Sequence, residues 1–541
     1  MLREERAHYP EPVSAGDKFA YLWKWVPLAL VIIFVAIVRI RLLGFPLERD
    51  EGEYAYLGQL ILQGVPPYKL AYNMKFPGVY FMYAVIMAVF GQTSSGIHFG
   101  LLLANIVSII LLYLVARKIT DHTGAIVASC AYGVLSLGPG IFGFAAHATH
   151  FVVLFTLAGL WTLLRSFEKK STWGYLWGGV FFGSAILMKQ SAVFSGIFGA
   201  LAVVGNVLSS KPLSMKNLCI YSSVYLAGLV APIAAVFIFL YSAGVFDKFW
   251  FWTFTYISHY VAQIPLDIAA GVFKKTALKA IDGFYLMWAL SVAGLIMGTL
   301  DKRLSGRKLL LVSFALFSFL SVCLGFYFRE HYYIVLLPVL SILAGVFCYS
   351  VEFFTKNRYL AVTLFLIAVF AGVGSNKEYF FTAEASRLAR AAYGVNPFPE
   401  SVEIAKFVAA RTRPDDTIAI LGSEPQILFY SKRRSATGYI YTYNLMEDHP
   451  YSLKMQGEMA ADIESKQPKI IIDVQIVASW GVVKSSREDI FHWADRYIAA
   501  NYRLVGVADI FRDHTVYEWG EAARKYSPRS PDYIRVYERG V

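Results

Sequence analysis

The stretch RDEGEYAYLGQLILQGVPPY, residues 49–68, follows the first long apolar run of the chain and carries three carboxylates, those of Asp50, Glu51 and Glu53. Asp50, Glu53 and Tyr54 fall at positions i, i+3 and i+4, which lie on one face of a helix. The same spacing fits a capping box, in which Asp50 accepts a hydrogen bond from the backbone N–H of Glu53 and Glu53 reaches back to the helix start. These residues alone therefore leave a structural and a functional interpretation open.

The composition around this stretch is that of a polytopic α-helical membrane protein. Of 541 residues, 57% are hydrophobic and only 16% are charged, which is outside the range of ordinary soluble domains. The net charge is +12, but many of the cations lie in short loops between apolar runs. That distribution is typical of topology determinants and argues against a nucleic-acid partner.

The apolar runs predict about 11 membrane-spanning helices. They lie at roughly 21–40, 97–116, 124–144, 150–166, 173–188, 191–208, 218–241, 283–300, 309–328, 332–350 and 359–374. Lys and Arg are concentrated in alternate loops, such as 165–170 and 302–308. The positive-inside rule then predicts a multi-pass protein of the inner (plasma) membrane with a cytoplasmic N-terminus.

Two long loops fall on the external side in this topology. Loop 42–96 contains the acidic stretch and is predicted to hold two helices along the membrane interface, at 51–63 and 79–90. Loop 242–282 contains Trp252 and Tyr256 in an aromatic-rich segment. Such residues are typical of an aromatic belt at the headgroup level, and the alternative is a mobile segment that closes over a bound lipid or sugar.

The composition changes at about residue 375, which divides the chain into a membrane domain, 1–375, and a soluble domain, 376–541. The second domain is predicted to be α/β and to lie outside the membrane, in the periplasm or the extracellular space. Its buried strands are expected at 417–422 and 469–477, and its helices at 401–413 and 487–502.

Ionisable residues at the outer ends of the predicted spans come out at the same membrane surface as the acidic stretch. Each alone could be a snorkelling or paired side chain, but together they predict one site. They are Lys75, His147, His150, Lys189, Arg329, Glu330 and His331.

Carboxylates combined with Lys, Arg and His at a bilayer suit a reaction on a phosphate-bearing lipid. Arg and Lys would hold the phosphate, and a carboxylate would act as general base on an incoming hydroxyl or amine. The charge of the leaving phosphate could be stabilised by cations, or by a divalent metal held on carboxylate and His. No ligand spacing is diagnostic, so the sequence leaves metal dependence open.

These residues resemble the large-loop GT-C glycosyltransferases, membrane enzymes related to dolichyl-phosphate-mannose protein mannosyltransferases and bacterial aminoarabinose-lipid A transferases. The resemblance rests on the early Asp-Glu after the first span, the Lys-x-Pro of the first loop, and Arg-x-His-Tyr-Tyr at 329–333. It covers roughly residues 20–375, and the tail segment IAILGSEPQILFYSKRRSATGYIYTY, 418–443, is similar to bacterial members. One position departs from many relatives, because Thr149 stands where they carry an acid; His147 or His150 is the candidate substitute.

The resemblance implies an inverting transfer of a sugar from a polyprenyl-phosphate donor to a lipid, glycan or protein acceptor on the external face. Asp50 then matches the catalytic base, with Glu51 as the second catalytic candidate. Lys75, Arg329 and His331 match the donor-phosphate region. The substrate or acceptor region would comprise Glu53, Tyr54, His147, His150, Lys189, Trp252, Tyr256 and Glu330.

Two other classes of function remain as alternatives. A transporter or flippase for a lipid-linked substrate would place its ionisable residues near the midplane and often shows inverted repeats, and no repeat is visible here. A non-catalytic scaffold would use the tail domain to bind a partner, for example through the basic run at 432–434. Neither the sugar nor the acceptor can be named from the sequence.

Overall fold

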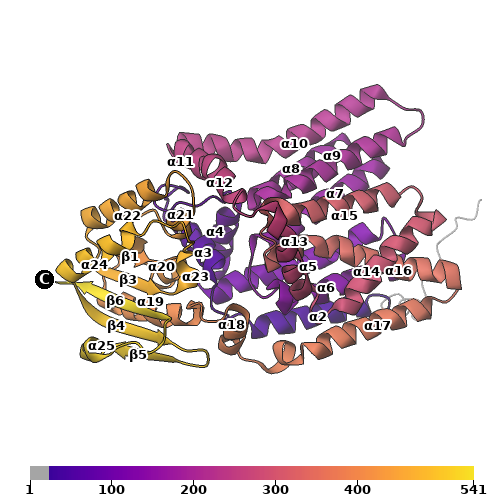
Figure 1. Ribbon diagram of the computed structural model, residues 1–541. Coiled ribbons are helices and arrows are strands. Elements are labelled where there is room, and N and C mark those ends of the chain that lie inside the picture. The colour runs from indigo at the N-terminus through magenta and orange to yellow at the C-terminus, as the bar shows by residue number, and fades with distance from the viewer. Residues whose placement is uncertain (1–22, 541) are drawn as a thin grey trace, which may run out of the picture.

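The computed structural model describes residues 23–540, and the first residues of the predicted first span and the preceding terminus lie outside that range. A helical bundle occupies one end of the molecule and a mixed sheet with its helices the other (Figure 1). Every apolar run predicted from the sequence forms a helix. These are α2 (Val26–Arg41), α5 (Ser94–Ala116), α6 (His122–Leu135), α7 (Ala148–Lys169), α8 (Thr172–Met188), α9 (Val193–Leu208), α10 (Met215–Ser242), α14 (Tyr285–Leu300), α15 (Lys308–Cys323), α16 (Leu337–Thr355) and α17 (Arg358–Ser375).

Not all of these helices are long enough to cross a membrane. Within the described residues, six are long and apolar enough to span a bilayer, and a seventh is obtained if α13 (Leu266–Ile281) and α14, bent by 107°, count as one span. Helices such as α6 and α4 (Gly78–Phe90) are apolar but shorter. The multi-pass helical architecture is therefore as predicted, while the count of eleven spans stays a prediction.

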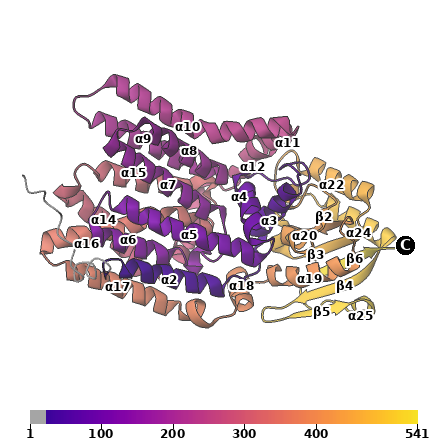
Figure 2. The same ribbon diagram turned by 180° about the vertical axis from the view of Figure 1, so that it is seen from behind.

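The two long loops, 42–96 and 242–282, contain helices. The first loop forms α3 (Arg49–Leu62) and α4, close to the predicted 51–63 and 79–90. The second forms α11 (Phe246–Trp250), a π-helical turn η3 (Phe251–Tyr256), α12 (Ile257–Val261) and α13. Both views place α3 between the bundle and the sheet (Figures 1 and 2). Short 3₁₀ turns complete the bundle: η1 (Pro139–Ile141), η2 (Gln190–Ala192), η4 (Lys302–Leu304), η5 (Leu324–Phe326) and η6 (Glu330–Leu336).

The sheet has six strands in the order β2-β1-β3-β6-β4-β5, with β2, β1 and β3 parallel and the other pairs antiparallel. The strands are β1 (Thr417–Leu421), β2 (Arg434–Ser435), β3 (Ile470–Gln475), β4 (Tyr502–Ile510), β5 (Thr515–Trp519) and β6 (Tyr533–Arg539). β1 and β3 are the two predicted strands, and their apolar residues are buried on both faces, as parallel strands require. The helices are α18 (Ala385–Tyr393), α19 (Phe398–Arg411), α20 (Pro425–Ser431), α21 (Tyr443–Met446), α22 (Ser452–Lys466), α23 (Val477–Trp480), α24 (Asp489–Asn501) and α25 (Glu521–Lys525).

The segment after α17 packs on the bundle before the sheet begins. It opens with a π-helical turn, η7 (Glu378–Thr382), in which the hydroxyl of Tyr379 donates to the carbonyl of Leu137 at 2.8 Å. Arg41, at the end of α2, donates to the carbonyl of Ala383 at 2.5 Å. The bundle and the sheet region are therefore tied together near residue 380, and the division into two domains at 375 stays a prediction.

Candidate active site

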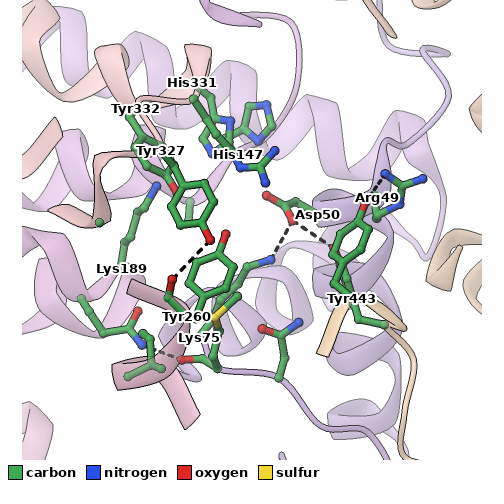
Figure 3. Close-up of a pocket in the computed structure, with 18 of the residues that line it drawn as sticks. Arg49, Asp50, Lys75, His147, Lys189, Tyr260, Tyr327, His331, Tyr332 and Tyr443 are labelled. Carbon is green, nitrogen blue, oxygen red and sulfur yellow. Dashed lines mark hydrogen bonds and ion pairs between the residues drawn. The ribbon is translucent and has the colours of Figure 1, made fainter. Parts of the chain in front are cut away.

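A cavity of about 580 Å³ lies where the bundle, α3 and the sheet region meet. Several separate parts of the chain line it. They include the first loop around α3, the segments around His147 and Lys189, the aromatic segment 252–263, the late loop 324–332, and the sheet region at 393–398, 441–447 and 478–483. Seven of the ionisable residues singled out in the sequence contribute to the lining (Figure 3). They are Asp50, Lys75, His147, Lys189, Arg329, Glu330 and His331.

The start of α3 differs from the capping box predicted for it. Glu48 is the N-cap: its carboxylate accepts from the backbone N–H of Glu51 at 2.9 Å, and the Glu51 carboxylate accepts from the Glu48 N–H at 3.4 Å. The pairing of Asp50 with Glu53 was wrong because the helix begins one residue earlier than Asp50. Asp50 consequently lies inside the first turn, and its carboxylate has no capping role.

The Asp50 carboxylate faces the cavity and is held by one of its two oxygens. Oδ1 accepts from Lys75 Nζ at 2.8 Å and from the Tyr441 hydroxyl at 3.0 Å. Among the described residues, none donates a hydrogen bond to Oδ2. Burial alone would raise the pKa of Asp50, but the charge of Lys75 holds that pKa well below its usual range. Asp50 is therefore an ionised carboxylate with one oxygen available.

Lys75 is shared between two carboxylates. Besides Asp50, its Nζ contacts Glu53 Oε2 at 2.5 Å, and the Tyr80 hydroxyl donates to the other Glu53 oxygen at 2.7 Å. The ammonium also lies 4.7 Å from the ring centroid of Tyr54, which lines the cavity. Burial would lower the pKa of Lys75, and the two carboxylates raise it. Its charge is thus already matched, which is not the environment expected of a free phosphate ligand.

The two other acids of the stretch are buried in different surroundings. Glu53 is fully buried, and burial raises its pKa despite the contact with Lys75. Glu51 is also fully buried, and its Oε1 accepts from the backbone N–H of Ala146 at 2.6 Å and lies 2.9 Å from His98 Nε2. The Glu51 carboxylate thus ties α3 to α5 and does not line the cavity, and its catalytic role stays a prediction.

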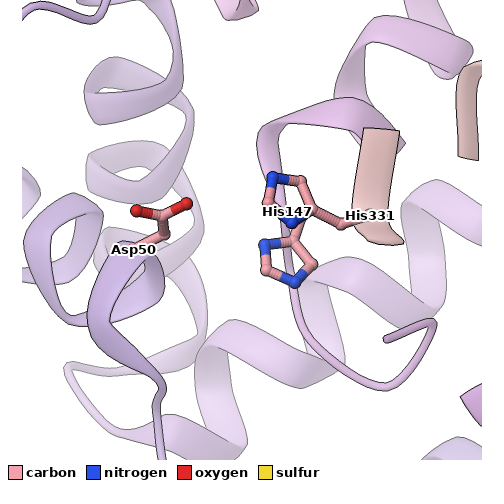
Figure 4. A group of neighbouring side chains, drawn as sticks. All are labelled: Asp50, His147 and His331. Carbon is pink, nitrogen blue, oxygen red and sulfur yellow. The ribbon is translucent and has the colours of Figure 1, made fainter. Parts of the chain in front are cut away.

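His147, His331 and Asp50 form a group whose ligand atoms all lie within 4.8 Å of one another (Figure 4). The two imidazole rings stack with centroids 4.1 Å apart and planes inclined by 13°. Burial lowers the pKa of His147 to about 4, so its ring is neutral at neutral pH. Neither ring nitrogen of His147 has a hydrogen-bond partner, although Nδ1 lies 3.6 Å from Glu48 Oε1. Two neutral imidazoles and a carboxylate are a donor set that fits a divalent transition metal.

His150 does not join this group. It lies in the first turn of α7 and is buried, with both ring nitrogens lacking a hydrogen-bond partner. It does not contribute to the cavity lining, whereas His147 does. Of the two histidines proposed in place of the missing acid at Thr149, the structure therefore brings only His147 to the site.

Lys189 and Arg329 are the cations of the cavity that form no ion pair with a described residue. Lys189 Nζ lies 3.4 Å from the ring centroid of Tyr332, and Arg329 Cζ lies 5.6 Å from that of Tyr327. Burial lowers the pKa of Lys189 well below its usual value, and an anion bound beside it would favour the charged ammonium. An anion placed between these two groups would supply the missing counter-charge, so this wall can bind a phosphate.

The aromatic segment closes another side of the cavity. Trp252 stacks on Tyr72 with centroids 5.8 Å apart, and the Tyr256 hydroxyl donates to Glu447. Both are almost fully buried, so the headgroup-belt interpretation is wrong for them, although it remains suitable for the exposed Trp250. Glu330 lies at the rim, where it pairs with Lys279 at 2.9 Å.

The residues that sequence reasoning missed come mainly from the sheet region. Tyr441 contacts Asp50, and the Tyr443 hydroxyl accepts from Arg49 Nη1 at 2.6 Å. Arg49 also pairs with the fully buried Glu424 at 2.6 Å. Both tyrosines belong to the segment 418–443 that carries the family resemblance, but no local pattern connects that segment to the first loop.

The comparisons with known proteins agree with the fold described above. Residues 74–241 match the family model described as dolichyl-phosphate-mannose-protein mannosyltransferase. None of the curated protein sequences matches the chain. Among solved structures, ArnT from Cupriavidus metallidurans, bound to undecaprenyl phosphate, is similar with a TM-score of 0.61 and 13% identity, covering 96% of this chain and 98% of that chain.

Two further structures extend the similarity. AglB from Archaeoglobus fulgidus, an archaeal oligosaccharyltransferase in complex with an inhibitory peptide and a dolichol-phosphate, has a TM-score of 0.53 and 12% identity over 93% of this chain and 75% of that chain. The arabinofuranosyltransferase AftD from Mycobacteria has a TM-score of 0.51 and 10% identity over 96% of this chain and 40% of that chain. The chain therefore shares the fold of these three structures, and residues 74–241 match the mannosyltransferase family model.

Proposed function

We propose that the protein transfers a sugar from a polyprenyl-phosphate donor to a hydroxyl or amine of a lipid, glycan or protein acceptor. The observation that carries this proposal is one cavity that combines an ionised carboxylate with a free oxygen, Asp50, and two cations without counter-charges, Lys189 and Arg329. The similar ArnT and AglB structures with undecaprenyl phosphate and dolichol-phosphate support a donor of this class.

The reaction assigned to this cavity is a single displacement at the anomeric carbon, which inverts its configuration. The acceptor oxygen or nitrogen forms a bond to that carbon as the bond from the carbon to the phosphate oxygen breaks. The electron pair leaves with the polyprenyl phosphate, whose charge is held by Arg329 and Lys189. The acceptor proton passes to Oδ2 of Asp50.

A direct test measures both sugar transfer and lipid movement with purified protein in lipid nanodiscs or vesicles. With an undecaprenyl-phosphate-linked sugar, the proposal expects release of undecaprenyl phosphate and attachment of the sugar to an acceptor. A flippase would move the donor across the bilayer with its glycosyl bond intact. The gathering of ionisable groups in one cavity between the bundle and the sheet region favours the transferase.

Replacing Arg329 with Ala should weaken donor binding more than replacing Lys75 with Ala. Arg329 has no described carboxylate partner, while Lys75 is already bonded to Asp50 and Glu53. Loss of one charge-assisted contact to phosphate costs roughly 1.5–3 kcal/mol, or about a tenfold to hundredfold rise in Kd. The measurement is titration of undecaprenyl phosphate into each variant. An unchanged Kd in Arg329→Ala would place the phosphate elsewhere.

Asp50, His147 and His331 are also the residues that would hold a divalent metal ion. When bound, such an ion would supply positive charge close to the leaving phosphate. We expect one Mn²⁺ ion to bind to each molecule of chelator-treated protein, which would be seen as loss of the electron paramagnetic resonance signal of the free ion. His147→Asn should abolish this binding. Absence of binding in the wild type would restrict the three residues to base catalysis and phosphate binding.

The orientation in the membrane is part of the proposal. The loop charges support a cytoplasmic N-terminus, and in that orientation the cavity and the sheet region would lie on the external side. A reporter that is active only in the periplasm should therefore be active when fused after Val541. A reporter active only in the cytoplasm should be inactive at the same position, and the reverse pattern would overturn this orientation.

A further inference from the structure

The sheet region contributes a side chain directly to the candidate base. Tyr441 and Asp50 are 391 positions apart in the sequence, yet the Tyr441 hydroxyl donates to Asp50 Oδ1 at 3.0 Å. Lys75, from the first loop, donates to the same oxygen at 2.8 Å. We propose that Tyr441 is a positioning residue for Asp50 and that the sheet region thereby completes the catalytic site. This inference rests on the proposed glycosyl transfer.

Lys75 and Tyr441 together fix the orientation of the Asp50 carboxylate. A carboxylate bonded at neither oxygen can turn about its Cβ–Cγ bond, and a single donor constrains that rotation only in part. Two donors from different directions fix Oδ1 and leave Oδ2 toward the cavity. Since the acceptor proton must be within hydrogen-bond reach of the base, the orientation of Oδ2 affects the rate of the reaction more than the binding of the donor.

Tyr441 can act as a fixed donor because its neighbour in the chain is locked into the sheet region. The Thr442 N–H donates to Ser423 Oγ at 2.9 Å, and the Thr442 hydroxyl donates to the carbonyl of Ser479 at 3.1 Å. Thr442, Ser423 and Ser479 are all fully buried. The Tyr441 ring also lies 5.4 Å from Lys75 Nζ, so the two donors to Asp50 contact each other.

The same interface contains contacts that do not reach the cavity. The backbone N–H of Ser435 donates to the Tyr56 hydroxyl at 2.9 Å. Gly52 of α3 lies so close to Gln426 of α20 that a Cβ at Gly52 would come within 2.6 Å of the Gln426 backbone. Tyr56 is therefore a matched control: it forms a tyrosine-mediated hydrogen bond between α3 and the sheet region without touching Asp50.

The test compares Tyr441→Phe with Tyr56→Phe in full-length protein reconstituted with undecaprenyl-phosphate-linked sugar. Loss of a hydrogen bond to a charged group corresponds to roughly a 10- to 100-fold change in a rate constant when that bond supports the transition state. We expect Tyr441→Phe to lower kcat by about that factor with the Kd for undecaprenyl phosphate within about twofold of wild type. Tyr56→Phe should keep the wild-type kcat, whatever it does to the melting temperature.

A double variant separates positioning from general destabilisation. In an Asp50→Asn background, Tyr441→Phe should produce no further fall in kcat, because the carboxylate it positions is gone. A wild-type kcat in Tyr441→Phe, or equal losses in Tyr441→Phe and Tyr56→Phe, would overturn the inference while leaving the proposed function intact. A raised Kd with unchanged kcat would also overturn it and make Tyr441 a donor-binding residue. Failure of the proposed function would be recognised separately, as a wild-type protein that transfers no sugar.

Discussion

Asp50→Asn should fold, insert and bind donor, yet transfer sugar about 100 to 10,000 times more slowly than the wild type. A carboxamide cannot accept a proton at neutral pH, and loss of a general base typically has this effect on the rate. The stability loss should be small, because Glu48, not Asp50, caps α3 and the Asp50 side chain is partly exposed to the cavity. Single-turnover transfer and donor titration measure the two effects separately.

Glu53→Gln is the matched control for this variant. Glu53 bonds the same Lys75, but it is fully buried and its pKa is raised, so an amide reproduces most of its hydrogen bonding. Its kcat should fall much less than that of Asp50→Asn. A folded Asp50→Asn protein with nearly wild-type turnover would remove Asp50 as the base. Glu330, at the cavity rim, would then be the next candidate, because Glu51 is enclosed by Ala146 and His98.

Arg49→Ala should destabilise the junction between α3 and the sheet region by about 3–5 kcal/mol. Arg49 donates to Ser423 O at 2.5 Å, to the Tyr443 hydroxyl at 2.6 Å and to Glu424 Oε1 at 2.6 Å. Glu424 is fully buried, so removing Arg49 leaves an uncompensated charge, which is the costly way to break a buried pair. Chemical unfolding followed by tryptophan fluorescence, with limited proteolysis of the sheet region, would measure the loss.

Adding Glu424→Gln to Arg49→Ala supplies the control for this prediction. The amide removes the buried charge, so the double variant should recover part of the stability lost in Arg49→Ala. Equal stability of Arg49→Ala and the wild type would show that the ion pair does not hold the sheet region against α3. In that event, the position of Tyr441 would need another explanation.

The sequence predicts the parts of this site that depend on topology. In the predicted topology, alternate span ends and the first loop lie on one side of the membrane, which is why Lys75, His147, Lys189 and Arg329 could be grouped from the sequence. The α3 helix was predictable from the spacing of its residues, which repeats with helical periodicity. Each apolar run likewise became a helix, although run length alone did not determine how many of these helices are full spans.

Two features of the site were beyond such reasoning. Neighbouring helical residues point about 100° apart, so the adjacent acids of α3 have different surroundings: Asp50 faces the cavity, while Glu51 contacts His98. The contacts of Tyr441 with Asp50 and of Arg49 with Glu424 join segments far apart in the chain. Tertiary packing alone brings these segments together, and periodicity carries no information about it.

The proposed site of sugar transfer is tested most directly by a cryo-electron microscopy map of the protein with an undecaprenyl-phosphate-linked sugar bound. We expect the phosphate between Arg329 and Lys189, with the anomeric carbon on the side of the cavity where Oδ2 of Asp50 can reach an incoming acceptor. Phosphate density outside this cavity, or a sugar separated from Asp50 by the walls of the site, would contradict the proposed glycosyl transfer at this site.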